Sequence, residues 1–181
     1  MQTVYKLTRP DRTTYNGFLY EPDREYRFPG NGDLCSSAYC HAYRSPELAV
    51  LCNLIHAAYD PHLLFECDAD VEQDDGLKLG VTRIIVPAEP INAPVYTTEQ
   101  RIAWAIACAW PRASAWQAWA HKWLSGDDRS AKAAWAAAEA AWAAAEAAAW
   151  AARAAAGAYI HRCAMWAHET TGPWTPQDWW T

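Results

Sequence analysis

The first half of the chain alternates apolar and polar positions, a pattern typical of half-buried strands. Val4–Thr8 and Val81–Val86 each predict a short strand, and Leu63–Val71 predicts a longer one. Thr13–Tyr20 is expected to return as the second arm of a hairpin with the first strand. Glu21–Asp33 contains two prolines and two glycines and is expected to form a surface loop.

Apolar residues follow a helical spacing in two further regions. Ser45 followed by Pro46 is typical of a helix start, and this helix is expected to end before Pro61. From Thr98 onward the pattern is helical throughout, with a long alanine-rich helix over about residues 128–168. We therefore predict an α+β fold: a small, mostly antiparallel sheet with one or two helices, followed by a helical hairpin or bundle that contains the alanine-rich helix.

The same change of pattern predicts the domain organisation. Residues 1–94 are expected to form an α+β head domain, and residues 95–172 a helical domain. Residues 173–181 form a short aromatic tail. A chain of 181 residues can bury a sizeable core, which bulky rings and alanine methyl groups would fill together.

The alanine-rich helix is interrupted only at positions that lie within roughly 80° of arc, when the chain is wound at about 100° per residue. Tryptophans and glutamates therefore share one stripe, and methyl groups cover the rest of the helix. Tryptophan is enriched at protein interfaces because it buries a large area at a small cost in rotamer freedom. We expect this stripe to contact a partner through Trp135, Glu139, Trp142, Glu146 and Trp150.

A row of five carboxylates is predicted along one face of the long strand, where side chains recur about every 6.5–7 Å. This spacing is close to that of the phosphates along a nucleic-acid strand, so the row could act as a DNA mimic toward a basic groove. The simpler interpretation is a half-exposed strand whose solvated charges discourage edge pairing. The row consists of Glu66, Asp68, Asp70, Glu72 and Asp74.

The formal net charge of −6 argues against non-specific binding to nucleic acid and to anionic membranes, since both need clustered lysine and arginine. No apolar run is as long as a membrane span, and Met1–Arg12 lacks a signal-peptide pattern. We expect a soluble protein of the cytoplasm. Six cysteines in a chain of this size favour buried free thiols in a reducing compartment.

Several short motifs carry a resemblance to a known family. They are the opening Val4-Tyr5-Lys6 with Pro10-Asp11, the segment Cys35-Ser-Ser-Ala-Tyr-Cys40-His41, the pair Ser45-Pro46, and Trp123–Asp127 before the alanine-rich helix. The chain resembles uncharacterised proteins common in bacteriophages, in which the cysteine segment often reads Cys-x-x-Gly-Leu-His; this glycine and leucine are absent here. The resemblance implies a phage origin and a bacterial host, and it brings no established activity.

Cysteines and histidines offer two chemical hypotheses. Cys35, Cys40 and His41, with His56 or His62, have spacings that a zinc site permits, but a second matched pair of ligands is absent. Packed thiols and a hydrogen-bonded histidine are favoured instead, and no metal or cofactor is expected. The other hypothesis is a nucleophile, Cys40 or Cys35, with His41 or His56 as its base. Cys40 and His41 would be a poor pair, because adjacent side chains on a strand point apart.

Our main interpretation is a non-enzymatic phage accessory protein that binds a host protein, such as a component of bacterial defence, in the manner of an anti-CRISPR inhibitor. One alternative is a small nucleotide-modifying enzyme of the ADP-ribosyltransferase type, which would use Tyr5, His41 and Arg83 but lacks a glycine-rich phosphate loop. The other alternative is a structural or self-associating protein with the helical part as its interface. No direct contact with nucleic acid or membrane is expected.

Overall fold

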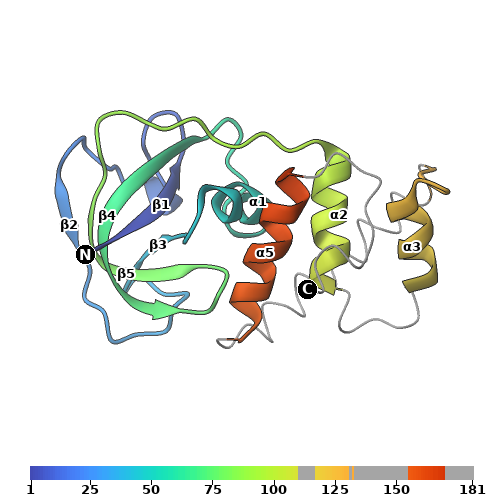
Figure 1. Ribbon diagram of the computed structural model, residues 1–181. Coiled ribbons are helices and arrows are strands. Elements are labelled where there is room, and N and C mark those ends of the chain that lie inside the picture. The colour runs from blue at the N-terminus through green and yellow to red at the C-terminus, as the bar shows by residue number, and fades with distance from the viewer. Residues whose placement is uncertain (110–116, 131, 133–154, 170–181) are drawn as a thin grey trace. The chain divides into compact units, whose positions relative to one another are not determined.

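The computed structural model describes residues 1–109, 117–130, 132 and 155–169. The chain divides into two compact units, Met1–Pro94 and Val95–Thr181. The first unit carries an antiparallel sheet of five strands and one α-helix, and the described part of the second unit is helical (Figure 1). The fold is therefore α+β, as the hydrophobic pattern predicts.

The sheet contains three long strands and two short ones. The strands are β1 (Gln2–Thr8), β2 (Glu25–Arg27), β3 (Cys40–Ala42), β4 (Leu63–Asp74) and β5 (Leu79–Ile85). β4 lies between β1 and β5. The other edge of β5 is shared, because β3 pairs with its first half and β2 with its second half.

Two tyrosines close the sheet on itself. Tyr5 of β1 and Tyr43, which follows β3, exchange backbone hydrogen bonds of 2.8 and 2.9 Å. The ladder therefore runs from β1 through β4, β5 and β3 back to β1, and the sheet curls around an apolar interior. This interior is filled by Val4, Tyr20, Cys40, Ala42, Phe65, Cys67, Ala69, Leu79, Val81, Ile84 and Val86.

The helix of the first unit, α1 (Pro46–His56), begins and ends as predicted. Ser45 Oγ accepts a hydrogen bond from the backbone N–H of Leu48 at 3.3 Å, which satisfies one of the free donors of the first turn. α1 packs against β1. The strands predicted from alternation are confirmed as β1, β4 and β5.

Two other predictions in the first unit are wrong. Thr13–Tyr20 is not a hairpin arm, because it forms only an isolated bridge around a short 3₁₀ turn, η1 (Tyr15–Gly17). Asn16 and Gly17 have φ angles of 58° and 72°, and this left-handed conformation turns the chain instead of extending it. Glu21–Asp33 is not wholly a loop, because it contains β2.

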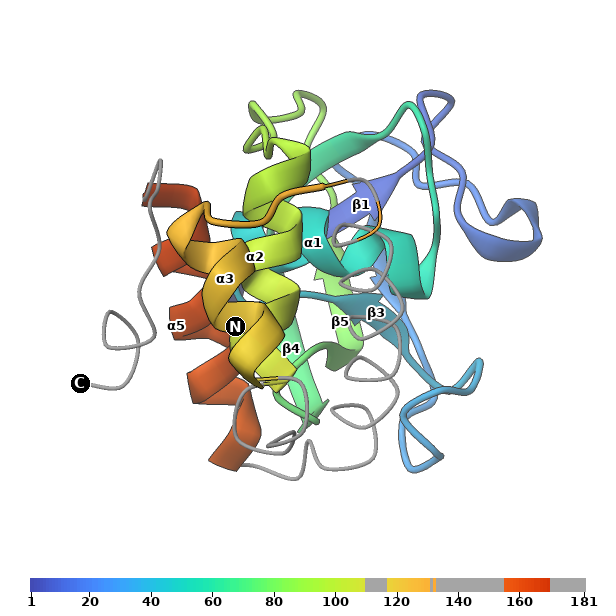
Figure 2. The ribbon, with the colours of Figure 1, turned by 90° about the vertical axis from the view of Figure 1, so that its right-hand side faces the viewer.

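The described helices of the second unit are α2 (Thr98–Ala109), α3 (Gln117–Ser125) and α5 (Ala155–Glu169). A capping box starts α2: Thr97 Oγ1 accepts from the Gln100 N–H at 3.1 Å, and Gln100 Oε1 accepts from the Thr97 N–H at 2.9 Å. α2 and α5 lie side by side (Figure 1, Figure 2), and Gln100 Nε2 donates to the His168 carbonyl oxygen at 3.1 Å.

Several sequence predictions lie outside the described residues. Of the predicted alanine-rich helix, the last part is described as α5. Residues 128–130, where that helix was expected to begin, are described and are not helical, and residues 131 and 133–154 lie outside the described residues. The aromatic tail also lies outside them, as do the predicted partner-binding residues Trp135, Glu139, Trp142, Glu146 and Trp150. Among the described helices, none combines the length and the apolar character that crossing a membrane requires.

Candidate functional site

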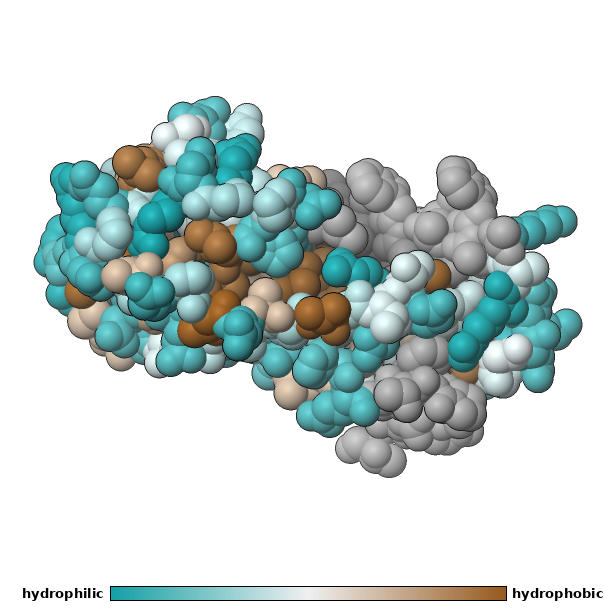
Figure 3. All heavy atoms as spheres, turned by 90° about the horizontal axis from the view of Figure 1, so that it is seen from above, coloured by the Kyte–Doolittle hydropathy of each residue, from teal (hydrophilic) through white to brown (hydrophobic). Residues whose placement is uncertain are grey.

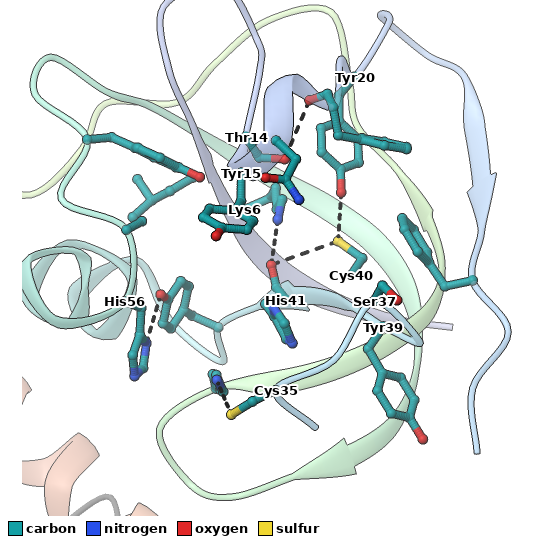
Figure 4. Close-up of a pocket in the computed structure, with 18 of the residues that line it drawn as sticks. Lys6, Thr14, Tyr15, Tyr20, Cys35, Ser37, Tyr39, Cys40, His41 and His56 are labelled. Atoms are coloured by element: carbon teal, nitrogen blue, oxygen red, sulfur yellow. Dashed lines mark hydrogen bonds between the residues drawn. The ribbon is translucent and has the colours of Figure 1, made fainter. Parts of the chain in front are cut away.

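A cleft of about 750 Å³ opens in the first unit, within the range of small-molecule sites, about 300–1,000 Å³. Five segments line it: β1, the loop around η1, the segment that leads into β3, the end of α1, and the turn between β4 and β5. Figure 4 shows side chains from these segments around a common space. Residues far apart in the sequence are thus gathered by the curl of the sheet.

The cleft is cationic. Its positive charge comes from two lysines, Lys6 and Lys78, whereas no aspartate or glutamate in the described part of the chain lines it. The whole chain carries a formal net charge of −6, so the local charge of the cleft is opposite in sign to the net charge of the protein. A concave site lined by one sign of charge raises the local concentration of ligands of the opposite sign.

Lys6 is the buried cation of the cleft. It lies on β1 opposite Phe65 of β4, and it is only 6% exposed. Its Nζ donates to the His41 carbonyl oxygen at 2.7 Å and lies 5.2 Å from the centre of the Tyr20 ring. No carboxylate oxygen of the described residues lies within 4.0 Å of this nitrogen. An ammonium removed from water without a counter-ion costs free energy, so the position favours an anion.

A tight turn places the second lysine. Asp75 Oδ1 accepts hydrogen bonds from the backbone N–H groups of Leu77 and Lys78 at 2.9 and 2.8 Å. Gly76 has a φ of 85°, a conformation that glycine adopts without a steric cost. Lys78 Nζ donates to Cys35 Sγ at 2.9 Å. The turn therefore holds the Lys78 ammonium beside the Cys35 thiol, which comes from the segment before β3.

The two histidines of the cleft are neutral at pH 7. Burial lowers the pKa of His41, and the positive charges of Lys78 and Lys6 lower it further. Burial lowers the pKa of His56 to about 4, and its Nδ1 lies 3.1 Å from the Tyr43 hydroxyl. A bound anion would raise both pKa values, because it would offset the charges of the lysines.

Aromatic rings form one wall of the cleft. The Phe18 ring centre lies 4.9 Å from that of Tyr20 and 5.9 Å from that of Phe28, and all three residues line the cleft. Phe18 is 42% exposed, and Tyr15 in the same loop is 79% exposed. Seen from above, the first unit carries apolar residues among polar ones on its surface (Figure 3). The exposed parts of Tyr15 and Phe18 are available to contact a planar group.

The acidic row predicted for the long strand lies on β4. Glu66 and Asp68 are exposed, and Glu66 accepts a hydrogen bond from the Tyr5 hydroxyl at 3.2 Å. Asp70 is half-buried and lies 3.2 Å from the amino group of Met1. Glu72 and Asp74 are exposed as well, so Asp70 is the one half-buried member of the row, and it is paired with a positive charge.

The end of the row is tied to neighbouring structure. Glu72 accepts hydrogen bonds from the Asn31 N–H at 3.0 Å and the Tyr39 hydroxyl at 2.8 Å, and these bonds lower its pKa. Asp74 forms an ion pair with Arg44. The register of β4 against β5 also shifts in this half of the strand. The five carboxylates therefore do not continue as one even ladder.

The cysteines and histidines do not gather as a zinc site would require. Among the described residues, no group of three or more His, Cys, Asp or Glu side chains could hold a metal ion. His41 Nε2 contacts the Leu34 carbonyl oxygen, and His62 Nδ1 lies 3.2 Å from the Tyr59 carbonyl oxygen. All six cysteines are free thiols, four of them buried, as predicted.

The residues of the cysteine-nucleophile hypothesis, Cys35, Cys40, His41 and His56, all line the cleft, whereas those of the ADP-ribosyltransferase hypothesis are not assembled there. Cys40 Sγ accepts a hydrogen bond from the Tyr20 hydroxyl at 3.2 Å, so its partner is a phenol and not a histidine base. Of the three residues proposed for an ADP-ribosyltransferase site, only His41 lines the cleft. Tyr5 is bonded to a carboxylate of β4, and Arg83 is held in an ion pair of the sheet.

Sequence reasoning missed both lysines and the aromatic wall. One signal was present for Lys6, since Val4 and Lys6 share a face of their strand and Val4 marks that face as buried. No local pattern marks Lys78, Tyr15 or Phe18, because turns and the curl of the sheet bring them to the cleft.

No family model, no curated protein and no solved structure matches this chain.

Proposed function

We propose that the first unit binds a small anionic ligand in its cleft. The observation that carries this proposal is the burial of Lys6, which is only 6% exposed in a cleft of ligand size and lacks a carboxylate partner among the described residues. Lys78 adds a second positive charge, and serine and tyrosine hydroxyls of the lining supply hydrogen bonds. A phosphate or carboxylate group fits this set, because charge-assisted hydrogen bonds are short and strong.

A purely structural role explains Lys6 less well. Its hydrogen bond to the His41 carbonyl oxygen joins β1 to β3, but a neutral donor could make that bond. Burying a full charge costs several kcal/mol unless a counter-charge offsets it, on the order of the whole stability margin of a small domain. A ligand anion supplies that counter-charge.

The test of this proposal follows the thermal unfolding of the full chain with pyrophosphate at fixed ionic strength. We expect pyrophosphate to raise the midpoint temperature, since a ligand at about 100 times its Kd stabilises the folded state by about 2.7 kcal/mol. Lys6→Met should abolish the rise, and Lys122→Met, at an exposed position of α3, should keep it. The proposal fails if the midpoint does not move, or if it rises equally in Lys6→Met.

A second function, association with a basic partner protein, is favoured by the exposure of Glu66 and Asp68 on β4. On the resemblance to phage proteins, we propose a host protein as the partner, such as a component of bacterial defence. Carboxylates that face a basic groove would speed up association with the partner and fix the orientation in which the two proteins bind. The formal net charge of −6 supports an attraction to basic surfaces.

Capture of proteins from a host lysate tests this second function. The wild-type chain should retain a basic host protein, and Asp68→Lys should lose it. Asp127→Lys makes the same change of charge at an exposed position of the second unit and should leave capture intact. Equal capture by all three chains would contradict a role of β4, and sedimentation at several concentrations would show whether the captured species is a second copy of the chain.

A further inference from the structure

We infer that the ligand of the cleft is a nucleotide, with its phosphate beside Lys6 and its base against the loop around η1; this inference rests on the proposed binding of an anion. This loop exposes three large apolar side chains within a stretch of five residues: Tyr15, Phe18 and Leu19. Two of them, Tyr15 and Phe18, line the cleft, and Figure 4 shows Tyr15 there. Exposed aromatic faces beside a cationic cleft match a ligand that is both planar and negatively charged.

Tyr20 connects the cationic and the aromatic parts of the cleft. Lys6 Nζ lies 5.2 Å from the centre of the Tyr20 ring, and that centre lies 4.9 Å from the centre of the Phe18 ring. The ammonium and the Phe18 ring therefore cannot be more than about 10 Å apart. One mononucleotide can span this distance with its phosphate at one end and its base at the other.

Hydrogen bonds hold the loop in place before a ligand binds. Arg9 Nη1 donates to the Thr14 carbonyl oxygen at 2.6 Å, and Arg12 Nε donates to the Tyr20 carbonyl oxygen at 2.8 Å. The Thr14 N–H donates to the Phe18 carbonyl oxygen at 2.9 Å. A pre-ordered loop loses little conformational entropy on binding, so stacking on its rings adds directly to affinity.

The polar lining disfavours another class of anion, the aliphatic acids. Hydroxyl and amide side chains also line the cleft: Thr14, Asn16, Ser36 and Ser37. An acyl chain laid across the exposed Asn16 and Ser37 would remove their polar groups from water without replacing those hydrogen bonds. The hydroxyls of a ribose and the polar edge of a base would satisfy them.

The test compares three probes on the full chain by isothermal titration: AMP, ribose 5-phosphate and adenosine. We expect AMP to bind about tenfold or more tightly than ribose 5-phosphate, because stacking of a base on an aromatic ring contributes about 5- to 150-fold in affinity. Tyr15→Ala should lower the affinity for AMP toward that for ribose 5-phosphate and leave the latter unchanged. Tyr15→Trp should restore it, and Leu19→Ala, at an exposed loop position outside the cleft lining, should have no effect.

The outcomes separate this inference from the function on which it rests. Equal affinities for AMP and ribose 5-phosphate would overturn the nucleotide and leave the anion site standing. An affinity for adenosine equal to that for AMP would overturn the placement of a phosphate beside Lys6. If none of the three probes binds and pyrophosphate gives no thermal shift, both the inference and the proposed function fail.

Discussion

Lys6 Nζ donates a 2.7 Å hydrogen bond to the backbone carbonyl oxygen of His41, so a charged side chain from β1 reaches β3 across the interior of the sheet. The face of the Tyr20 ring, 5.2 Å away, also attracts this ammonium. These contacts offset part of the cost of burying the charge, but neither the carbonyl nor the ring carries a negative charge. An anion in the cleft would complete the set of partners.

Replacing Lys6 by methionine tests whether the buried charge serves binding or folding. Methionine nearly matches the length of lysine without its charge, so Lys6→Met removes the cost of burying an ion while packing is largely kept. We expect the free energy of unfolding, measured in urea, to stay within about 1 kcal/mol of the wild-type value or to rise. A loss of more than about 3 kcal/mol would mean that the ammonium is a structural element of the sheet.

The stability of the chain should fall as the pH drops from about 6.5 to about 4. Burial lowers the pKa of His56 from 6.5 to about 4 in the folded state. The unfolded chain therefore takes up a proton first as the pH falls, and up to about 3 kcal/mol of stability is lost across this window. His41, whose pKa burial also lowers, adds to the loss.

Urea midpoints measured between pH 7 and pH 4 check this expectation. His56→Gln removes the titrating group and should flatten the decline, although the part due to His41 should remain. A decline as steep in His56→Gln as in the wild type would show that other groups cause it.

Glu72 should titrate below the ordinary range of glutamate. The Asn31 N–H and the Tyr39 hydroxyl both donate to its carboxylate and lower its pKa. In an NMR titration, Tyr39→Phe should raise this pKa without restoring the ordinary value, because the Asn31 bond remains. Tyr5→Phe, which removes a hydroxyl bonded to Glu66 instead, should leave it unchanged. An unchanged pKa in Tyr39→Phe would show that the Tyr39 hydroxyl does not stabilise the Glu72 carboxylate.

The capping box of α2 should contribute measurably to stability. Thr97 Oγ1 accepts the Gln100 N–H at 3.1 Å, and loss of such a cap typically costs about 1 kcal/mol. Thr97→Ala should therefore lower the free energy of unfolding by about this amount, measured in urea. The matched control is Thr98→Ala in the first helical residue, which should change it by less than about 0.5 kcal/mol. Equal effects of the two substitutions would argue against the cap.

Elements that depend on local signals could be predicted from the sequence. The alternation in Leu63–Val71 predicts β4, and Phe65, Cys67 and Ala69 are buried as that alternation requires. Ser45 and Pro46 mark the start of α1 through the chemistry of its first turn. β2 and β3 have only three residues each and depend on pairing with β5, so no local pattern indicates them.

The candidate site is formed by contacts between residues far apart in the sequence. Little of it could therefore be predicted from local sequence patterns. The bridge between Tyr5 and Tyr43 closes the sheet, and it joins positions whose own patterns give no sign of the pairing. The acidic row was predicted from its spacing, but the contacts of Glu72 with Tyr39 and of Asp74 with Arg44 come from distant segments. The sequence therefore predicted five equivalent carboxylates, whereas their contacts in the structure differ.

The most direct measurement of the central claim is an NMR titration of the full chain with pyrophosphate, which follows the signals of Lys6, His41 and Lys78. We expect saturable shifts gathered on these residues, together with a rise in the pKa of His41 as the anion offsets the lysine charges. Shifts spread over exposed lysines and arginines, with Lys6 and His41 unmoved, would contradict an anion site in this cleft.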